Sequence, residues 1–311
     1  MPETISSCGF WLFIFLGLVW VAPNQAGNTR LAKIDPLHAV PSLSEALSSF
    51  TAVVVTGGSS GIGKSFIELM GKLNPSLQFC NLSRREPVIK NLGKKLNHFP
   101  CDLSRPAELA RAADAVATFL AQTVPAGRVL LINNSGFGSY GYFPEPGLAQ
   151  QLEMLDLNVR GLVDLTGRLL PLLKARGGAI INLASTAAFQ PTAYAATYGA
   201  SKAFVLHWSL ALNEELRGTG VGCLAVCPGP TATEFFKRGG LKEGSVPDSL
   251  SMTCEEVVMA SLRALAAGRS QVVTGWKNQV GAFFASKLPK PWAARLTARV
   301  LARFRLKQVA R

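Results

Sequence analysis

Tyr198 and Lys202, four residues apart, are the pair whose spacing in this chain most directly suggests chemistry. On a helix their side chains project from the same face, one turn apart. An ammonium group beside a phenol favours the phenolate, so we expect the pKa of Tyr198 to fall from its ordinary value of about 10. Such a phenol can exchange a proton with a substrate oxygen. The spacing alone is weak support, because surface pairs of this kind also arise by chance.

A glycine-rich segment at residues 57–63 follows a β-branched strand expected at residues 52–56 and precedes a helix expected at residues 64–73. Its glycines allow a tight turn and a close approach of the backbone to a pyrophosphate at the helix N-terminus. Between a strand and a helix, this pattern predicts a nucleotide-binding turn. The residues expected at the cofactor are Gly57, Ser59, Ser60, Gly61, Ile62 and Gly63.

The next expected strand, residues 77–82, ends at Ser83, Arg84 and Arg85. In a dinucleotide-binding fold this point faces the adenosine ribose, where an acidic residue selects a free 2′-hydroxyl group. Two arginines suit a 2′-phosphate instead, and Lys64 adds positive charge nearby. The sequence therefore favours NADP(H) over NAD(H). The simpler alternative is that these are solvated loop charges.

Strands and helices alternate as far as residue 274 and predict a single α/β domain, a Rossmann-type doubly wound parallel sheet flanked by helices. Further strands are expected at residues 98–102, 129–132, 179–183, 222–226 and 271–274. Further helices are expected at residues 106–122, 147–173, 194–216 and 253–267. A flap is expected at residues 235–252. Because ligands collect at the carboxyl ends of such strands, we expect the following residues near the ligand: Asp102, Leu103, Asn134, Ser135, Gly136, Ser185, Pro228, Gly229, Thr231 and Thr233.

From about residue 51 to residue 274 the chain resembles the short-chain dehydrogenase/reductase family. The motifs that carry the resemblance are Thr56-Gly57-x-x-x-Gly61-x-Gly63, Asn133-Asn134-Ser135-Gly136, Asn158, Ser185, Tyr198-x-x-x-Lys202 and Pro228-Gly229. Ser135 departs from the pattern, because alanine is commoner there. The resemblance implies an oxidoreductase that interconverts a carbonyl and an alcohol with NADP(H). The alternative is a non-catalytic NADPH-binding regulator or scaffold on the same fold.

The same resemblance implies a role for each of four catalytic residues. Tyr198 would be the acid in carbonyl reduction and the base in alcohol oxidation. Lys202 would lower the pKa of that tyrosine and hold the nicotinamide ribose. Ser185 would bind the substrate oxygen, and Asn158 would support a water molecule in the proton relay. A homodimer or homotetramer, paired through the helices that carry Asn158 and Tyr198, is also implied.

Four further residues lie close to these motifs. Thr231 and Thr233 follow the Pro-Gly turn, and contacts with the carboxamide and pyrophosphate are expected of them. Tyr194 has no lysine four residues later, which favours a pocket-wall aromatic residue over a catalyst. His207, one helical turn beyond Lys202, is interpreted as a packing or surface histidine.

The composition narrows the possible partners. The 311 residues carry a net charge of +13, and eleven Lys or Arg and no Asp or Glu lie after residue 256. No zinc-finger spacing or RNA-binding signature accompanies the basic residues, so nucleic-acid binding is not favoured. The six cysteines show no C-x-x-C spacing and are interpreted as reduced thiols, with no metal site.

An apolar run at residues 10–22 suggests a membrane anchor within an N-terminal extension, residues 1–50. Arg30 and Lys33 follow the run, so the bulk of the chain would face the cytoplasm. A cleaved signal, a mis-chosen start codon and a packed helix remain alternatives. The family domain is expected at residues 51–275.

The remaining segment, residues 276–311, is expected to be a basic amphipathic tail. One helical row holds the cations Arg295, Arg299, Arg303 and Lys307. The adjacent row holds Trp292, Leu296, Val300 and Phe304. Three interpretations stay open: a helix on anionic lipid, a cap over an apolar substrate pocket, and a helix docked on its own domain. The first two favour an apolar carbonyl or alcohol as substrate.

Overall fold

The computed structural model describes residues 43–302 except 91, 125, 144 and 234–250, and it contains one parallel sheet of seven strands. The strands are β1 (Phe50–Thr56), β2 (Gln78–Ser83), β3 (Leu96–Pro100), β4 (Arg128–Asn133), β5 (Gly178–Leu183), β6 (Val221–Cys227) and β7 (Gln271–Val273). Their order in the sheet is β3-β2-β1-β4-β5-β6-β7. The direction of winding reverses between β1 and β4, so a ligand crevice is expected at the carboxyl ends of these two strands.

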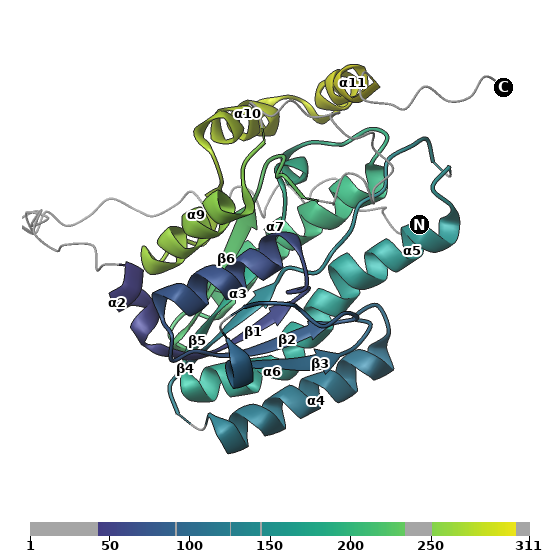
Figure 1. The fold of residues 1–311 in the computed structure, drawn as a ribbon. Coiled ribbons are helices and arrows are strands. Elements are labelled where there is room, and N and C mark those ends of the chain that lie inside the picture. The colour runs from purple at the N-terminus through teal and green to yellow at the C-terminus, as the bar shows by residue number, and fades with distance from the viewer. Residues whose placement is uncertain (1–42, 91, 125, 144, 234–250, 303–311) are drawn as a thin grey trace, which may run out of the picture. The chain divides into compact units, whose positions relative to one another are not determined.

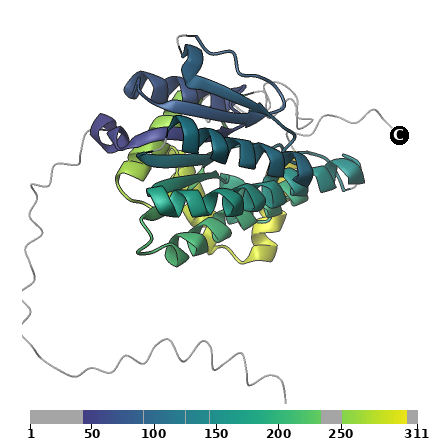
Figure 2. The same cartoon turned by 90° about the horizontal axis from the view of Figure 1, so that it is seen from below.

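Helices cover both faces of the sheet (Figures 1 and 2), which confirms the predicted Rossmann-type architecture. The α-helices are α2 (Leu43–Ser48), α3 (Gly61–Leu73), α4 (Pro106–Thr123), α5 (Leu148–Leu155), α6 (Leu162–Arg176), α7 (Ala196–Glu215), α9 (Cys254–Ala266), α10 (Trp276–Lys287) and α11 (Lys290–Leu301). Three short helical segments are η1 (Gly93–Lys95), the π-helical η2 (Asp156–Gly161) and η3 (Thr186–Phe189). Side chains of α3 and α9 pack on one face of the sheet, and those of α4 and α6 pack on the other.

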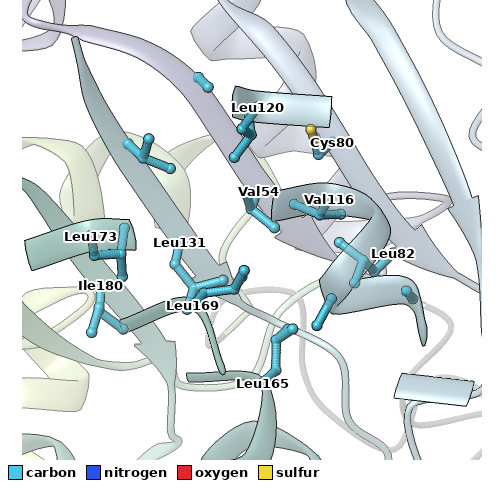
Figure 3. Close-up of a cluster of buried hydrophobic side chains, with 14 of the residues drawn as sticks. Val54, Cys80, Leu82, Val116, Leu120, Leu131, Leu165, Leu169, Leu173 and Ile180 are labelled. Carbon is cyan, nitrogen blue, oxygen red and sulfur yellow. The ribbon is translucent and has the colours of Figure 1, made fainter. Parts of the chain in front are cut away.

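Alternation along β1 divides its side chains between two hydrophobic cores. Val53 and Val55 belong to the core under α3 and α9, while Ala52 and Val54 belong to the core under α4 and α6. Figure 3 shows the second core, in which Val54 lies among side chains of β4, α4 and α6. Full burial of a Val or Leu side chain stabilises the fold by about 1.5–3 kcal/mol.

Among the departures from the expected element boundaries, three concern elements that carry predicted site residues or precede them. The third strand ends at Pro100 rather than at residue 102, which leaves Asp102 in the loop beyond it. The long helix expected at residues 147–173 is a helical run in which the π-turn η2 separates α5 from α6. The helix that carries Tyr198 begins at Ala196, because Tyr194 has a φ of 64° and cannot continue a right-handed helix.

Several predictions concern the chain ends. No helix within the described residues is long and apolar enough to cross a membrane, so the expectation of a membrane-anchored, cytoplasm-facing chain is wrong for this part of the molecule. The apolar run at residues 10–22 lies outside the described residues. So does the predicted flap, except for its last two residues, Ser251 and Met252. The predicted domain limits at residues 50 and 275 stay predictions.

Candidate active site

The glycine turn joins β1 to α3 and faces a cavity. Gly57 and Gly61 have φ values of +71° and +56°, which L side chains rarely adopt. A Cβ atom on Gly57 would lie 2.8 Å from Ser135 Oγ, and one on Gly63 would lie 2.5 Å from the Gly57 carbonyl oxygen. The first two glycines therefore permit the turn, whereas Gly63 permits close packing of α3 against it.

The end of β1 is tied to the turn that follows β4. Thr56 Oγ1 accepts hydrogen bonds from the backbone N–H groups of Asn134 and Ser135, each at 2.9 Å. The side-chain amide of Asn134 donates to the Thr56 carbonyl oxygen at 2.9 Å. These bonds hold the two predicted cofactor-binding turns side by side across the switch point.

Asn81 on β2 is a fully buried polar residue that was not among the predicted site residues. Its Oδ1 accepts a hydrogen bond from the Gly58 N–H at 2.8 Å, and its Nδ2 donates to Ser83 Oγ at 2.8 Å. Ser83 Oγ in turn donates to the carbonyl oxygen of Arg85 at 2.7 Å. Asn81 therefore connects the glycine turn to the basic turn. A polar residue within an otherwise apolar strand was the signal that could have revealed it.

Arg84 and Arg85 lie at the exposed end of β2 and line the cavity. Arg84 Nη1 is 3.9 Å from Asp102 Oδ2 and 4.0 Å from Glu153 Oε1. Exposed ion pairs of this kind contribute little, so the Arg84 guanidinium group is available to a ligand. Burial acts to raise the pKa of Asp102, but hydrogen bonds from Ser104 and the nearby arginines lower it overall.

Three of the four predicted catalytic residues meet at the carboxyl ends of β5 and β6. Tyr198 and Lys202 lie on α7, and the side chain of Ser185, just beyond β5, is hydrogen-bonded to Tyr198. Lys202 Nζ lies 6.0 Å from the centre of the Tyr198 ring. The ammonium group donates to the Leu183 carbonyl oxygen at 2.7 Å, which holds it at the wall of a cavity that Lys202 lines.

The pKa of the Tyr198 phenol differs from the expectation. Burial raises the pKa of Tyr198 to about 12, and its hydrogen bond with Ser185 opposes this rise. The expected fall in the pKa is therefore wrong for this structure. Burial also lowers the pKa of Lys202 to about 8, while the neighbouring Cys227 acts in the other direction. For both groups, burial disfavours the charged form more than neighbouring groups favour it.

Asn158 lies in the π-turn η2, a distortion that often accompanies functional sites. Its side chain is buried and exchanges two hydrogen bonds with the backbone of Phe137, at 3.1 and 2.9 Å. Asn158 Nδ2 also lies 3.1 Å from Ser201 Oγ, which donates to the Tyr198 carbonyl oxygen at 2.7 Å. The side chain of Asn158 thus links the turn after β4 to α7, the helix that carries Tyr198.

All of these turns open on one cavity of about 1590 Å³. Every predicted site residue lines it except Gly63 and Asn158, which lie behind the wall. The lining therefore includes Gly57, Ser59, Ser60, Gly61, Ile62, Ser83, Arg84, Arg85, Asp102, Leu103, Asn134, Ser135, Gly136, Ser185, Tyr198, Lys202, Pro228, Gly229, Thr231 and Thr233. Thr233 Cγ2 would lie 3.3 Å from a Cβ on Gly61, so this threonine sits directly against the glycine turn.

Of two neighbouring residues, Tyr194 lies differently from its interpretation and His207 agrees with it. Tyr194 was expected in the pocket wall, but it is Tyr140 that lines the cavity. The Tyr194 ring packs against the rings of Tyr140 and Tyr142, with centroids 6.0 and 5.0 Å apart. His207 is exposed on α7, as a surface histidine would be.

The far side of the cavity is lined by α10 and α11, which belong to the segment expected to be a basic amphipathic tail. Ala282, Leu288, Leu296 and Val300 are among the residues that line it. Three hydrogen bonds secure α11: Lys290 Nζ donates to the Phe189 carbonyl oxygen at 3.1 Å, Thr297 Oγ1 donates to the Pro191 carbonyl oxygen at 2.8 Å, and the Tyr140 hydroxyl donates to the Leu301 carbonyl oxygen. The helix α11 therefore packs on its own domain and borders the cavity, as two of the three interpretations of the tail require.

The fold and this cavity define an NAD(P)-dependent dehydrogenase or reductase. A family model for short chain dehydrogenases matches residues 51–243. The chain belongs to the short-chain dehydrogenase/reductase family, and the resemblance in its motifs is confirmed.

Similar proteins include a reductase and cofactor-bound dehydrogenases. The ketoacyl reductase HetN from a Nostoc species is 31% identical in an alignment of 189 residues, and the match covers 57% of this chain and 62% of that protein. A short chain dehydrogenase from Burkholderia cenocepacia in complex with NADP has a TM-score of 0.66 at 26% identity, covering 80% of this chain and 98% of the other. A short-chain dehydrogenase from Sphingobium yanoikuyae in complex with NADPH has a TM-score of 0.63 at 28% identity, covering 84% and 99%.

Proposed function

We propose that this chain reduces a carbonyl group to an alcohol with NADPH, with Tyr198 as the proton donor. The observation that carries the proposal is the convergence of Ser185, Tyr198 and Lys202 on one cavity beside the glycine turn. With its pKa raised to about 12, the Tyr198 phenol stays protonated at neutral pH, which is the form that carbonyl reduction needs. The nicotinamide cofactor supplies the hydride when bound.

Each residue of the site has a defined task in this proposal. Ser185 and Tyr198 hold the substrate oxygen through their hydroxyl groups, and the Tyr198 hydroxyl delivers a proton to it. Lys202 places a positive charge under the site and can hold ribose hydroxyl groups. Asn158 fixes the turn after β4 against α7, so its part in a water relay would not involve direct contact of its side chain with the cavity.

The preference for NADP(H) over NAD(H) rests on the basic turn. Arg84 and Arg85 line the cavity where the adenosine ribose would lie, and the residues at the end of β2 include no carboxylate. Guanidinium groups suit bidentate binding of a 2′-phosphate. The NADP and NADPH bound to the two similar dehydrogenases support the same assignment.

An apolar substrate is favoured by the cap. The surfaces that α10 and α11 turn toward the cavity consist largely of small and aliphatic side chains, among them Ala285, Leu288, Leu296 and Val300. Such a wall binds a substrate by burying apolar surface rather than by recognising charge. We therefore expect apolar ketones or aldehydes to be better substrates than charged ones.

We further propose that the chain forms a homodimer or homotetramer through α5 and α7. Leu148, Leu152 and Leu155 of α5 and Phe204 of α7 are exposed apolar side chains on these two helices. Pairing would remove them from water. Light scattering of the full chain tests this, and a strictly monomeric species at micromolar concentration would contradict it.

The test of the function is NADPH oxidation with ketones and aldehydes of graded chain length, repeated with NADH. Tyr198→Phe should abolish turnover while cofactor binding stays close to that of the wild type, because only the hydroxyl group is lost. Retained turnover would refute the role of Tyr198. Binding of NADPH without turnover of any carbonyl would favour the alternative, a regulator or scaffold that binds NADPH.

A further inference from the structure

The outer surface of α10 and α11 presents aromatic side chains to solvent. Trp276 is 71% exposed, Trp292 68%, Phe284 63% and Phe283 58%. The inward surfaces of the same helices bury small residues instead, Ala282 on α10 and Ala293 on α11. Folding alone favours the opposite arrangement, with large rings inside and small or polar residues outside. In Figure 1 the two helices, coloured yellow, lie together at one end of the sheet.

On α10, Trp276, Val280, Phe283 and Lys287 follow one another at intervals of four, three and four residues. This spacing places them in one outward row, since side chains three and four residues apart share a helix face. All four are exposed, and none lines the cavity. The row is therefore separate from the surface that α10 contributes to the active site.

Cations surround this aromatic surface. Lys287 of α10 and Arg295 and Arg299 of α11 are all exposed, and none of them lines the cavity. The ammonium group of Lys287 lies 5.7 Å from the centre of the Phe283 ring. No Asp or Glu follows residue 256 in the sequence, so no carboxylate on these helices offsets the positive charge.

We infer that the outer face of α10 and α11 docks on the surface of an anionic lipid bilayer. The aromatic rings would enter the boundary between headgroups and acyl chains, and the lysines and arginines would contact anionic headgroups. This is binding in the plane of the membrane and requires no spanning helix. The face belongs to the described residues only and does not depend on the apolar run near the N-terminus.

Charge argues against two other occupants of this face. A second copy of the chain, docked through the same face, would bring two sets of lysines and arginines together. Duplex nucleic acid would satisfy the cations, but its bases are already stacked, so its phosphate surface would leave the Phe and Trp rings of α10 without an apolar environment. A lipid surface satisfies both kinds of side chain.

The decisive experiment measures sedimentation of the full chain with lipid vesicles. Vesicles of phosphatidylcholine containing about one third phosphatidylserine should bind the wild type at least tenfold more tightly than pure phosphatidylcholine does. The triple variant Lys287→Glu, Arg295→Glu and Arg299→Glu should lose about a hundredfold in affinity for the anionic vesicles. Equal binding of wild type and variant would overturn the inference.

A matched control distinguishes binding through the outer face of α10 and α11 from a general effect of net charge. Arg111→Glu, Lys174→Glu and Arg263→Glu change the net charge by the same amount at exposed positions of α4, α6 and α9. This control variant should retain vesicle binding to within a few-fold. A loss as large as that of the α10–α11 variant would show a general charge effect and would refute a defined docking face.

An aromatic variant tests the apolar contribution. Trp276→Ala, Phe283→Ala and Trp292→Ala leave every cation in place and should weaken binding to anionic vesicles by at least about tenfold. If the wild type is retained on immobilised duplex DNA and does not bind vesicles, the inference is refuted and the face is assigned to nucleic acid. A dimer that this variant converts to a monomer, again without vesicle binding, would assign it to a second copy.

An assay of enzyme activity without vesicles tests the proposed function separately from the docking face. None of the substituted residues lines the cavity, so NADPH oxidation with a water-soluble carbonyl, measured without vesicles, should be the same in all the variants. If the wild type binds vesicles but has no such activity, the proposed function fails and the docking face stands. If it is active but does not bind vesicles, the docking face fails alone.

Discussion

Replacing Asn81 with leucine should uncouple the glycine turn from the basic turn. The buried Gly58 N–H, which now donates to Asn81 Oδ1 at 2.8 Å, would lose its partner. An unpaired buried donor costs about 1–3 kcal/mol, and loss of the bond to Ser83 Oγ adds about 1 kcal/mol. We therefore expect the free energy of unfolding to fall by about 2–4 kcal/mol in Asn81→Leu.

The same substitution should weaken NADPH binding by at least about tenfold, because the residues that would hold the pyrophosphate and the 2′-phosphate lie on the two uncoupled turns. Urea denaturation gives the free energy of unfolding, and titration of the folded variant gives the NADPH dissociation constant. Asn97→Ala on β3 is the matched control, since its amide makes one long bond of 3.4 Å to the Phe79 carbonyl oxygen. That control should cost less than about 1 kcal/mol. If Asn81→Leu behaves like Asn97→Ala in both measurements, Asn81 does not brace the cofactor site.

Three further predictions concern other parts of the domain. A Cβ on Gly136 would lie 2.9 Å from Asn158 Oδ1 and 3.4 Å from Lys202 Nζ, so Gly136→Ala should lower kcat at least about tenfold without unfolding the chain; an unchanged kcat would contradict this. Burial lowers the pKa of Lys202 from 10.5 to about 8, so the unfolded chain holds that proton more tightly. Relative to Lys202→Met, the wild type should therefore gain up to about 3 kcal/mol of stability as pH rises from about 8 to 10.5, and urea denaturation showing a loss instead would refute the assignment. Thr253→Ala removes a capping box with Glu256 at the start of α9 and should cost about 1 kcal/mol in thermal unfolding, whereas an unchanged Tm would show that the cap is not needed.

The elements that local sequence determines were predictable. At residues 50–73 a strand, the glycine turn and a helix follow one another in the chain as expected. Ser185 likewise lies just beyond the end of its strand, β5. Because parallel strands place their carboxyl ends at one edge of the sheet, residues far apart in sequence could be assigned to one site without coordinates. The Tyr198–Lys202 pair was predictable in the same way, since helix geometry alone places both side chains on one face.

The properties that depend on tertiary surroundings were not predictable from spacing. The pKa of Tyr198 rises rather than falls because burial outweighs the influence of the ammonium group, and burial is not a property of the four-residue spacing. Likewise, the rows of α11 were visible in the sequence, but spacing could not show that Leu296 and Val300 line the cavity while Trp292, from the same row, stays exposed.

The site is oriented from within the sheet by buried asparagines. Asn133 on β4 donates to Asn182 Oδ1 at 2.8 Å and to Thr166 Oγ1 on α6 at 2.9 Å. Asn182 on β5 donates to Ser209 Oγ on α7 at 2.9 Å, so the helix that carries Tyr198 is bonded to the strand that precedes Ser185. The hydrophobic effect is non-directional, whereas a buried hydrogen bond is satisfied in only one register of the helix on the sheet. In the same way, the buried Asn81 connects the glycine turn to the basic turn. Polar residues inside the strands thereby fix the positions of the turns and of α7, on which the proposed chemistry depends.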